Sequence, residues 1–353
     1  MRYAESVFTL RSDLVQDDDT PVLCVIIVGE SATRRQLGIY GNTPDTTPFF
    51  TGLKQNYPDN FFIFPEAFAV NVYTKDVLPE IFSNSSHMHR LKFAEKISIF
   101  DLCRAADIYA GVLSNQNDSV GQWYYFHQQG DTVFTGKLTK QLTVLDFTTP
   151  PDEVLLPLIE DRLQRLDFNK KNLLIIHLFG SHVTYSNRVP NGFIFPIAKK
   201  QYLSDSEYHY ARSIYYTDWI LSQIFTMVER RSTVPYVILY LSDHGEDPTG
   251  KVYRSEGLSA LSAEIFEIPC TVFLSDQYID IYPDKYEALR QNFRNFFCNE
   301  FIFDSIIGLL NLRNLPQGVY HPEMDIFSND YEASKNRARI VNDRYSLIDV
   351  LGK

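Results

Sequence analysis

Two apolar segments of this sequence lead directly into residues that can bind a metal ion. The run at 236–241 is followed by Asp243 and His244, and the run at 21–28 is followed by Glu30. Zinc and manganese accept carboxylate oxygens and imidazole nitrogens as ligands. Because open α/β sheets bind ligands at the carboxyl ends of their strands, we expect these three side chains to form a metal site. Structural roles stay open, namely a capping turn at Asp243 and an acid favoured by the helix dipole at Glu30.

A third stretch supplies a hydroxyl group. Thr74 follows a predicted strand at 61–68 and stands at the start of a predicted helix, as the cap or in the first turn. A nucleophile at this position would be helped by the helix dipole and by free backbone N–H groups. The alternative, and the more common role for an isolated threonine, is helix capping.

Further polar residues follow two other predicted strands. Asn115 and Gln116 come after the strand at 108–113, and His182 comes shortly after the strand at 173–178. These positions favour contact with a ligand or substrate at the same sheet edge, although a surface loop would also explain Asn115 and Gln116.

The elements that must position these residues alternate along the chain. Apolar runs predict strands at 21–28, 61–68, 108–113, 173–178, 236–241 and 267–274. Helical spacing predicts helices at 97–106, 154–166, 208–230 and 285–312. This alternation predicts a three-layer α/β/α sandwich with a mostly parallel central sheet. No linker is evident, so we expect one catalytic domain over 1–353, with a polar lead-in at 1–20, a peripheral insertion at 131–170 and a loop-rich region at 313–353.

Composition narrows the class of protein. Of the 353 residues, 44% are hydrophobic, enough for a large core. The net charge of −11 argues against a nucleic-acid partner. The four cysteines are far apart, which favours buried free thiols, although pairing stays open. No apolar run reaches the ~18 residues that span a bilayer, and no signal peptide is evident. We therefore expect a soluble chain, or the soluble domain of a longer membrane protein.

In order along the chain, these motifs resemble the lipopolysaccharide phosphoethanolamine transferases of the sulfatase-like branch of the alkaline phosphatase superfamily. The resemblance covers roughly residues 21–280, the soluble catalytic domain of that family. The matching motifs are Val28-Gly-Glu-Ser-Ala32, Thr74 with Pro79 and Ile81-Phe-Ser83, Ser114-Asn-Gln116, His177-Leu-Phe-Gly-Ser-His182, Tyr216-Thr-Asp218 and Leu241-Ser-Asp-His-Gly-Glu246.

The resemblance implies a zinc ion and a covalent mechanism. Glu30, Asp243 and His244 would bind zinc together with the oxygen of Thr74, with a second zinc ion or manganese as alternatives. Thr74 would be the nucleophile that carries a phosphoethanolamine adduct.

The resemblance also implies substrate contacts and a location. His182 would contact the phosphate or a second metal, and Asn115 and Gln116 would lie near the substrate head group. Family members are anchored in the bacterial inner membrane, face the periplasm and take the head group from phosphatidylethanolamine. This chain would then act at a membrane surface on a lipopolysaccharide component, either lipid A, a core sugar or another glycan.

Departures from the family pattern leave the acceptor open. The region 253–257 has no histidine where members that modify lipid A carry one, and Glu256 could supply an oxygen ligand there. Val120 stands near a position that is often lysine, and no cysteines flank Thr74. The Cys-x-Pro-x-Arg signature is also missing, which argues against a formylglycine sulfatase. Two alternatives remain: a phosphodiesterase or phosphatase of the same superfamily, and an inactive sulfatase-like binding domain.

Overall fold

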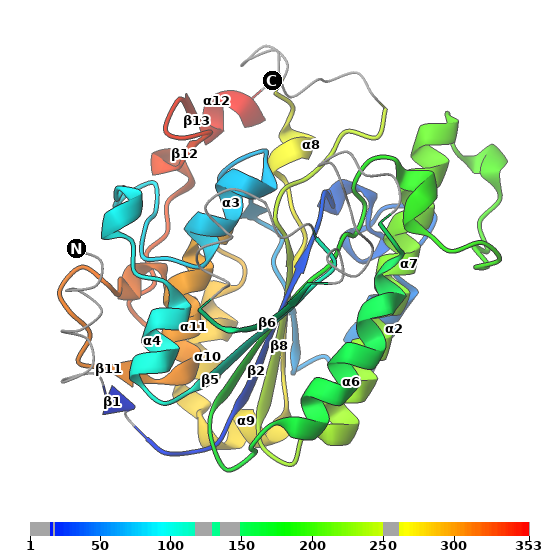
Figure 1. Cartoon of the computed structure of the whole chain (residues 1–353). Coiled ribbons are helices and arrows are strands. Elements are labelled where there is room, and N and C mark those ends of the chain that lie inside the picture. Colours follow the sequence, from blue (N-terminus) through cyan, green and yellow to red (C-terminus); the bar gives the residue numbers. More distant parts are fainter. Residues whose placement is uncertain (1–14, 17, 117–128, 135–148, 250–260, 353) are drawn as a thin grey trace.

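A seven-stranded mixed sheet forms the centre of the computed structural model, which describes residues 15–16, 18–116, 129–134, 149–249 and 261–352 (Figure 1). In spatial order its strands are β3 (Phe61–Ile63), β9 (Cys270–Leu274), β8 (Tyr236–Ser242), β2 (Leu23–Gly29), β7 (Asn172–His177), β5 (Tyr109–Ser114) and β6 (Asp131–Phe134). The strands from β8 to β6 pair in parallel, whereas β9 runs antiparallel to both of its neighbours.

Helices cover both faces of this sheet (Figure 1). One face carries α2 (Pro48–Asn56), α6 (Leu156–Arg165) and α7 (Asp205–Arg231). The other face carries α3 (Thr74–Ile81), α4 (Ile99–Ala105), α9 (Asp276–Ile281), α10 (Pro283–Asn292) and α11 (Ile302–Leu310). Two short helices, α8 (Ala263–Phe266) and α12 (Leu347–Leu351), also bury apolar side chains against this second core. The predicted three-layer α/β/α sandwich is therefore confirmed.

The central strand β2 shows why its sequence is apolar without alternation. Leu23, Val25 and Ile27 point into the core under α2, α6 and α7. Cys24 and Ile26 point into the core under α3, α4 and α11. Because successive side chains of a strand face opposite sides, a strand covered on both sides must be apolar at every position.

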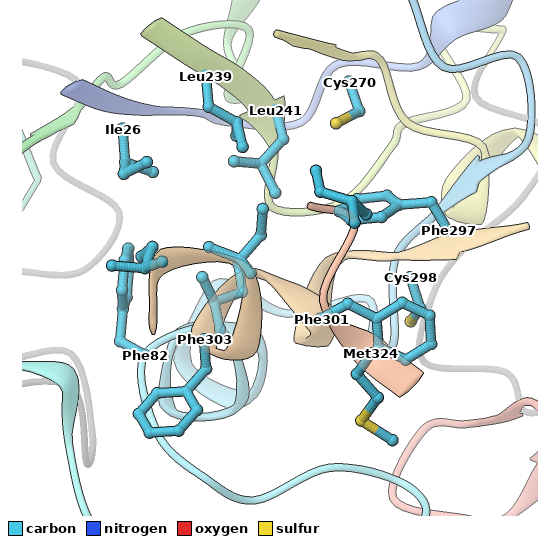
Figure 2. Packing of buried hydrophobic residues seen from close by; sticks show 14 of the residues in the cluster. Ile26, Phe82, Leu239, Leu241, Cys270, Phe297, Cys298, Phe301, Phe303 and Met324 are labelled. Atoms are coloured by element: carbon cyan, nitrogen blue, oxygen red, sulfur yellow. The ribbon is translucent and has the colours of Figure 1, made fainter. Parts of the chain in front are cut away.

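The second core is built largely from rings and branched side chains (Figure 2). Ile26 of β2 and Leu239 and Leu241 of β8 belong to the same packed layer as Phe303 of α11, and all four are fully buried. The sheet edge that carries the predicted ligands is thereby fixed to the helices beneath it.

Four sequence predictions need correction, the first at 131–170. Asp131–Phe134 is the edge strand β6 of the main sheet, not part of a peripheral insertion. The strand is short and begins with Asp131 and Thr132, so it lacks the apolar run of a buried strand. The helix predicted at 154–166 is α6, which packs against α7.

Two other predicted elements are each divided in the structure. The strand predicted at 61–68 ends at Ile63, and Ala67–Phe68 forms β4, which pairs with β10 (Phe297–Cys298). Pro65 lies between the two strands and lacks the N–H that a continuous ladder needs. Strand β10 likewise interrupts the helix predicted at 285–312 and separates α10 from α11.

The end of the polar lead-in is also part of the fold. Val15–Gln16 forms β1 and pairs with β11 (Leu312–Arg313), whereas we expected a solvated segment. The buried ammonium of Lys171 donates to the Asp18 carbonyl over 2.8 Å and lies 3.4 Å from the Asp18 carboxylate. A buried lysine requires hydrogen-bond or charge partners. Here Asp18 is such a partner, and it lies in the polar lead-in, where no apolar run predicts structure.

The described residues 313–352 contain only short elements, in agreement with the loop-rich sequence of this region. They include the hairpin of β12 (Arg339–Ile340) and β13 (Tyr345–Ser346). Met324, Ile340 and Leu347 nevertheless bury their side chains in the core on the α3 side of the sheet.

Two further expectations concern the cysteines and the membrane. All four cysteines are buried free thiols, as predicted. Among the described residues, no helix is both long enough and apolar enough to cross a bilayer.

The full burial of Ile26 predicts a large effect of its truncation. We expect Ile26→Ala to lower the free energy of unfolding by about 2–5 kcal/mol, because the change removes buried methyl groups and leaves a cavity. Ile281, which is 45% exposed, is the matched control, and Ile281→Ala should change stability by less than about 0.5 kcal/mol. Urea unfolding followed by circular dichroism measures both, and equal losses would contradict this account of the core.

Candidate metal centre and nucleophile

The pairing of β2 with β8 brings the two predicted carboxylates together. Gly29 is in register with Ser242, so the next residue of each strand, Glu30 and Asp243, leaves the sheet at the same point. Both residues are buried, with at most 1% of their surface exposed. The backbone N–H of Asp243 donates to the carbonyl of Gly29 over 3.1 Å and continues the pairing beyond the strands.

The hydroxyl of Thr74 lies between these two carboxylates. Its Oγ1 is 2.6 Å from Asp243 Oδ2 and 2.8 Å from Glu30 Oε2. Thr74 is the first residue of α3, so the positive end of the helix dipole is directed at the same place. A hydroxyl has one proton and can donate to one carboxylate at a time. The other close contact is therefore repulsive unless a proton or a cation relieves it.

His244 completes the group and has a defined orientation. Its Nδ1 lies 2.8 Å from the Gly245 carbonyl, which favours a proton on that nitrogen and leaves Nε2 as a lone-pair donor. Nε2 lies 3.3 Å from Glu30 Oε1 and 3.5 Å from Asp243 Oδ2.

The donor set fits a divalent metal ion. Glu30, Asp243 and His244 each offer one ligand atom, and these atoms lie within 4.8 Å of one another. Two carboxylates and one imidazole are a common zinc donor set, and ligand atoms around tetrahedral zinc are separated by about 3.3 Å. The observed separations are close to that value, so zinc would be held with little rearrangement.

The electrostatics of these three residues also favour a bound cation. Burial and the neighbouring Glu30 carboxylate raise the pKa of Asp243 to about 7. Burial by itself would also raise the pKa of Glu30, but the His244 imidazole and the hydrogen bonds to Glu30 hold it well below its usual value. Two buried carboxylates in contact disfavour double ionisation, and a bound cation would remove that penalty.

Neutral donors hold the two carboxylates in position. Ser31 donates its hydroxyl to Glu30 Oε1 over 2.6 Å and its backbone N–H to Asp243 Oδ1 over 3.1 Å. Ser31 has a φ of 59°, a left-handed conformation that directs both groups into the site. The amide of Gln116 donates to Glu30 Oε2 over 3.0 Å, and Asn299 donates to the Asp243 carbonyl over 2.7 Å. Outer contacts of this kind orient ligands and tune their affinity for the metal.

The other predicted residues occupy varied positions. Gln116 contacts Glu30, as described above. Asn115 is buried and donates to the Asp152 carboxylate and the Pro150 carbonyl, so its amide supports the loop. His182 is half-buried, stacks on Phe179 with ring centroids 4.9 Å apart, and lies near enough to Glu30 to lower its pKa. The predicted substrate contacts of these residues stay predictions, and Glu256 lies outside the described residues.

Besides Asn299, three other buried residues near the centre were missed by sequence reasoning. The guanidinium of Arg188 lies 4.3 Å from the centroid of the Phe179 ring, is 3% exposed, and interacts electrostatically with Asp152 and Glu30. Asp152 accepts the backbone N–H groups of Phe179 and Gly180 and fixes the loop after β7. Tyr210 donates its hydroxyl to the Ser31 carbonyl over 2.7 Å. None of them follows a strand, so no local signal marked them.

Comparison with known proteins shows what this chain is similar to. A family model described as Sulfatase matches residues 23–312. A phosphoethanolamine transferase, EptA from Helicobacter pylori, is 27% identical over 323 residues, which cover 87% of this chain and 57% of the relative. The putative transferase YhbX from Escherichia coli K12 is 28% identical over 254 residues, which cover 71% of this chain and 43% of the relative. The chain thus spans about half the length of these relatives.

Solved structures share the fold. The C-terminal periplasmic domain of EcEptC from Escherichia coli, also solved in complex with zinc, superposes with a TM-score of 0.76 at 18% identity, covering 94% of this chain and 93% of that one. The soluble domain of lipooligosaccharide phosphoethanolamine transferase A from Neisseria meningitidis gives a TM-score of 0.73 at 21% identity, covering 90% and 96%.

The raised pKa of Asp243 predicts how metal binding depends on pH. Below about pH 7 a proton competes for this carboxylate, so the apparent zinc affinity should fall by up to about tenfold per pH unit and level off above pH 7. Chelator-competition titrations at a series of pH values measure the slope. Asp243→Asn, which cannot ionise, should bind zinc more weakly and with a smaller slope. A zinc affinity that does not change with pH below pH 7 would contradict the raised pKa of Asp243 beside Glu30.

Proposed function

This chain belongs to the sulfatase family, and from that premise we propose that it is a metal-dependent phosphoethanolamine transferase that works through a covalent adduct on Thr74. One observation carries the proposal: the Thr74 hydroxyl lies within 2.8 Å of two buried carboxylates that share a site with an imidazole. A capping threonine needs no such surroundings. Phosphoethanolamine is proposed as the transferred group because the similar proteins are named phosphoethanolamine transferases.

Glu30, Asp243, His244 and the Thr74 oxygen would hold zinc, as one ion or with a second ion or manganese as alternatives. Bound zinc would lower the pKa of the threonine hydroxyl and withdraw charge from the phosphoryl oxygens. The chain itself provides the proton acceptor, because Asp243 Oδ2 and Glu30 Oε2 are both within hydrogen-bond distance of Oγ1. It also provides the N–H groups and the dipole of the first turn of α3 for the charge that develops on phosphorus.

Transfer would proceed in two balanced steps. In the first, Thr74 Oγ1 gives its proton to Asp243 or Glu30 and forms a bond to the phosphorus of phosphatidylethanolamine, and the bond from phosphorus to the lipid alcohol breaks as that oxygen takes the proton. In the second, an acceptor hydroxyl gives its proton to the same carboxylates and forms a bond to the phosphorus, and the bond from phosphorus to Oγ1 breaks as Oγ1 takes the proton back. His182 would contact the phosphate, and Asn115, Gln116 and Glu256 would lie near the substrate.

The acceptor and the location follow from the relatives by analogy. We propose a lipopolysaccharide component, lipid A or a core sugar, as the acceptor. We also propose that the chain is the periplasmic catalytic domain of an inner-membrane protein and works at the membrane surface. The match to C-terminal periplasmic domains supports this, and residues 1–353 would then act as one catalytic unit.

A hydrolase of the same superfamily is the second candidate. The same nucleophile and metal would serve it, with water in place of the acceptor hydroxyl. The half-buried position of Thr74 permits either acceptor to reach the adduct.

Substitution of the nucleophile tests the proposal. We expect Thr74→Ala to keep the fold and to lose at least about a thousandfold in turnover, since the substitution removes the hydroxyl that lies between the two carboxylates. Thr74→Ser should retain measurable activity because it keeps the hydroxyl. Thr226→Ala, on the exposed side of α7, is the matched control and should behave as wild type.

The assay should incubate the protein with phosphatidylethanolamine and identify the adduct by mass spectrometry of the peptide that contains Thr74. Adding lipid A then separates the two candidates, because a transferase labels the lipid whereas a hydrolase releases free phosphoethanolamine. Full activity of Thr74→Ala would rule out the covalent scheme.

A further inference from the structure

A second cluster of metal-binding side chains lies away from the Thr74 site. His89, His321 and Glu323 each offer one ligand atom, and these atoms lie within 4.8 Å of one another. We refer to these three residues as the His89 cluster. His89 follows α3 and the other two residues belong to the C-terminal region, so the cluster joins segments that are far apart in sequence (Figure 1). Thr74 begins the eight-residue α3 and His89 lies beyond its other end, so about 12 Å of helix separates the two sites along the chain.

The two imidazole rings stack face to face with centroids 3.9 Å apart and an interplanar angle of 9°. Because an imidazole nitrogen binds a metal in the plane of its ring, at least one ring must turn for both to bind the same ion. The Nε2 atoms of both His89 and His321 are buried, and neither has a hydrogen-bond partner among the described residues. Buried polar nitrogens are normally satisfied, and a bound ion is one of the recognised explanations when they are not.

The cluster also contains a negative charge that suits a cation. Glu323 Oε1 lies 3.6 Å from His321 Nδ1 and supplies the compensating negative charge.

The backbone at both ends of the cluster is held in place without a metal. The Ser86 and His89 backbone groups exchange hydrogen bonds of 3.2 Å, and the Ser86 hydroxyl accepts the His89 N–H as well. The His321 N–H donates to the Asp304 carboxylate over 2.7 Å. Metal binding would therefore require rotation of the side chains but no rearrangement of the backbone.

We propose that the His89 cluster is a zinc site, distinct from the centre at Thr74, that ties the segment after α3 to the C-terminal region. Two imidazoles and one carboxylate match the zinc donor set and leave a fourth position for water. His89 and His321 border an open groove of about 750 Å³, which gives the ion a path from solvent. The inference does not depend on the proposed transferase activity.

The experiment counts zinc in a background that lacks the first site. Glu30→Gln with His244→Ala removes two of its ligands, and bound zinc is then measured by mass spectrometry after excess zinc is removed by gel filtration. We expect one ion per chain in this background and fewer than about 0.1 after His89→Ala and His321→Ala are added. His209→Ala, a histidine substitution elsewhere on the chain, is the matched control and should leave one ion bound.

A single conservative substitution tests whether zinc is lost because a ligand is removed or because the protein unfolds. Glu323→Gln keeps the shape of the side chain and should weaken zinc binding by about tenfold or more, with an unchanged circular dichroism spectrum. Cobalt provides a second readout, because its visible absorption reports tetrahedral nitrogen and oxygen ligands and should disappear with the two alanine substitutions. A background protein that binds no zinc, or equal binding with and without the two histidines, would overturn the proposal.

Discussion

The proximity of two buried carboxylates, Glu30 and Asp243, is the constraint around which the rest of the site is arranged. The β2–β8 register brings the backbone of the two residues to the same point of the sheet edge. Like charges this close are unfavourable in a buried setting, so the fold holds an electrostatic strain at one edge of its sheet. A divalent cation is the simplest group that would turn this repulsion into binding energy.

The surroundings of this contact limit how the strain can be relieved. Ser31, Gln116 and Asn299 all donate neutral hydrogen bonds to the pair or its backbone. Neutral donors fix the carboxylates without cancelling their negative charge. A lysine or arginine in the same position would cancel it. The buried Arg188 packs over the Phe179 ring and interacts with Glu30 through space. The net negative charge is therefore kept for a ligand.

Helix α3 connects this centre to the rest of the molecule. Its first residue supplies the hydroxyl, and the buried Glu80 near its last turn pairs with Lys96 over 2.8 Å and with Arg90 over 3.2 Å. Arg90 also pairs with Asp343 of the C-terminal region over 2.7 Å. The C-terminal region thus braces the helix from the end opposite Thr74. A zinc ion at the His89 cluster would add a second tie between the same two segments.

The sequence by itself determined the mostly parallel α/β architecture and four members of the centre. Apolar runs without alternation mark buried strands, and polar residues just after them, such as Glu30 and Asp243, mark the carboxyl edge. The same local signal did not reveal β6, because an edge strand need not be apolar, nor the break at Pro65. Residues such as Asn299 and Tyr210 reach the site from elements remote in sequence, and His89 meets His321 only in the folded chain. Only the tertiary structure decided these contacts, because strand register and helix packing set which distant side chains meet, and neither is encoded by the spacing of neighbouring residues.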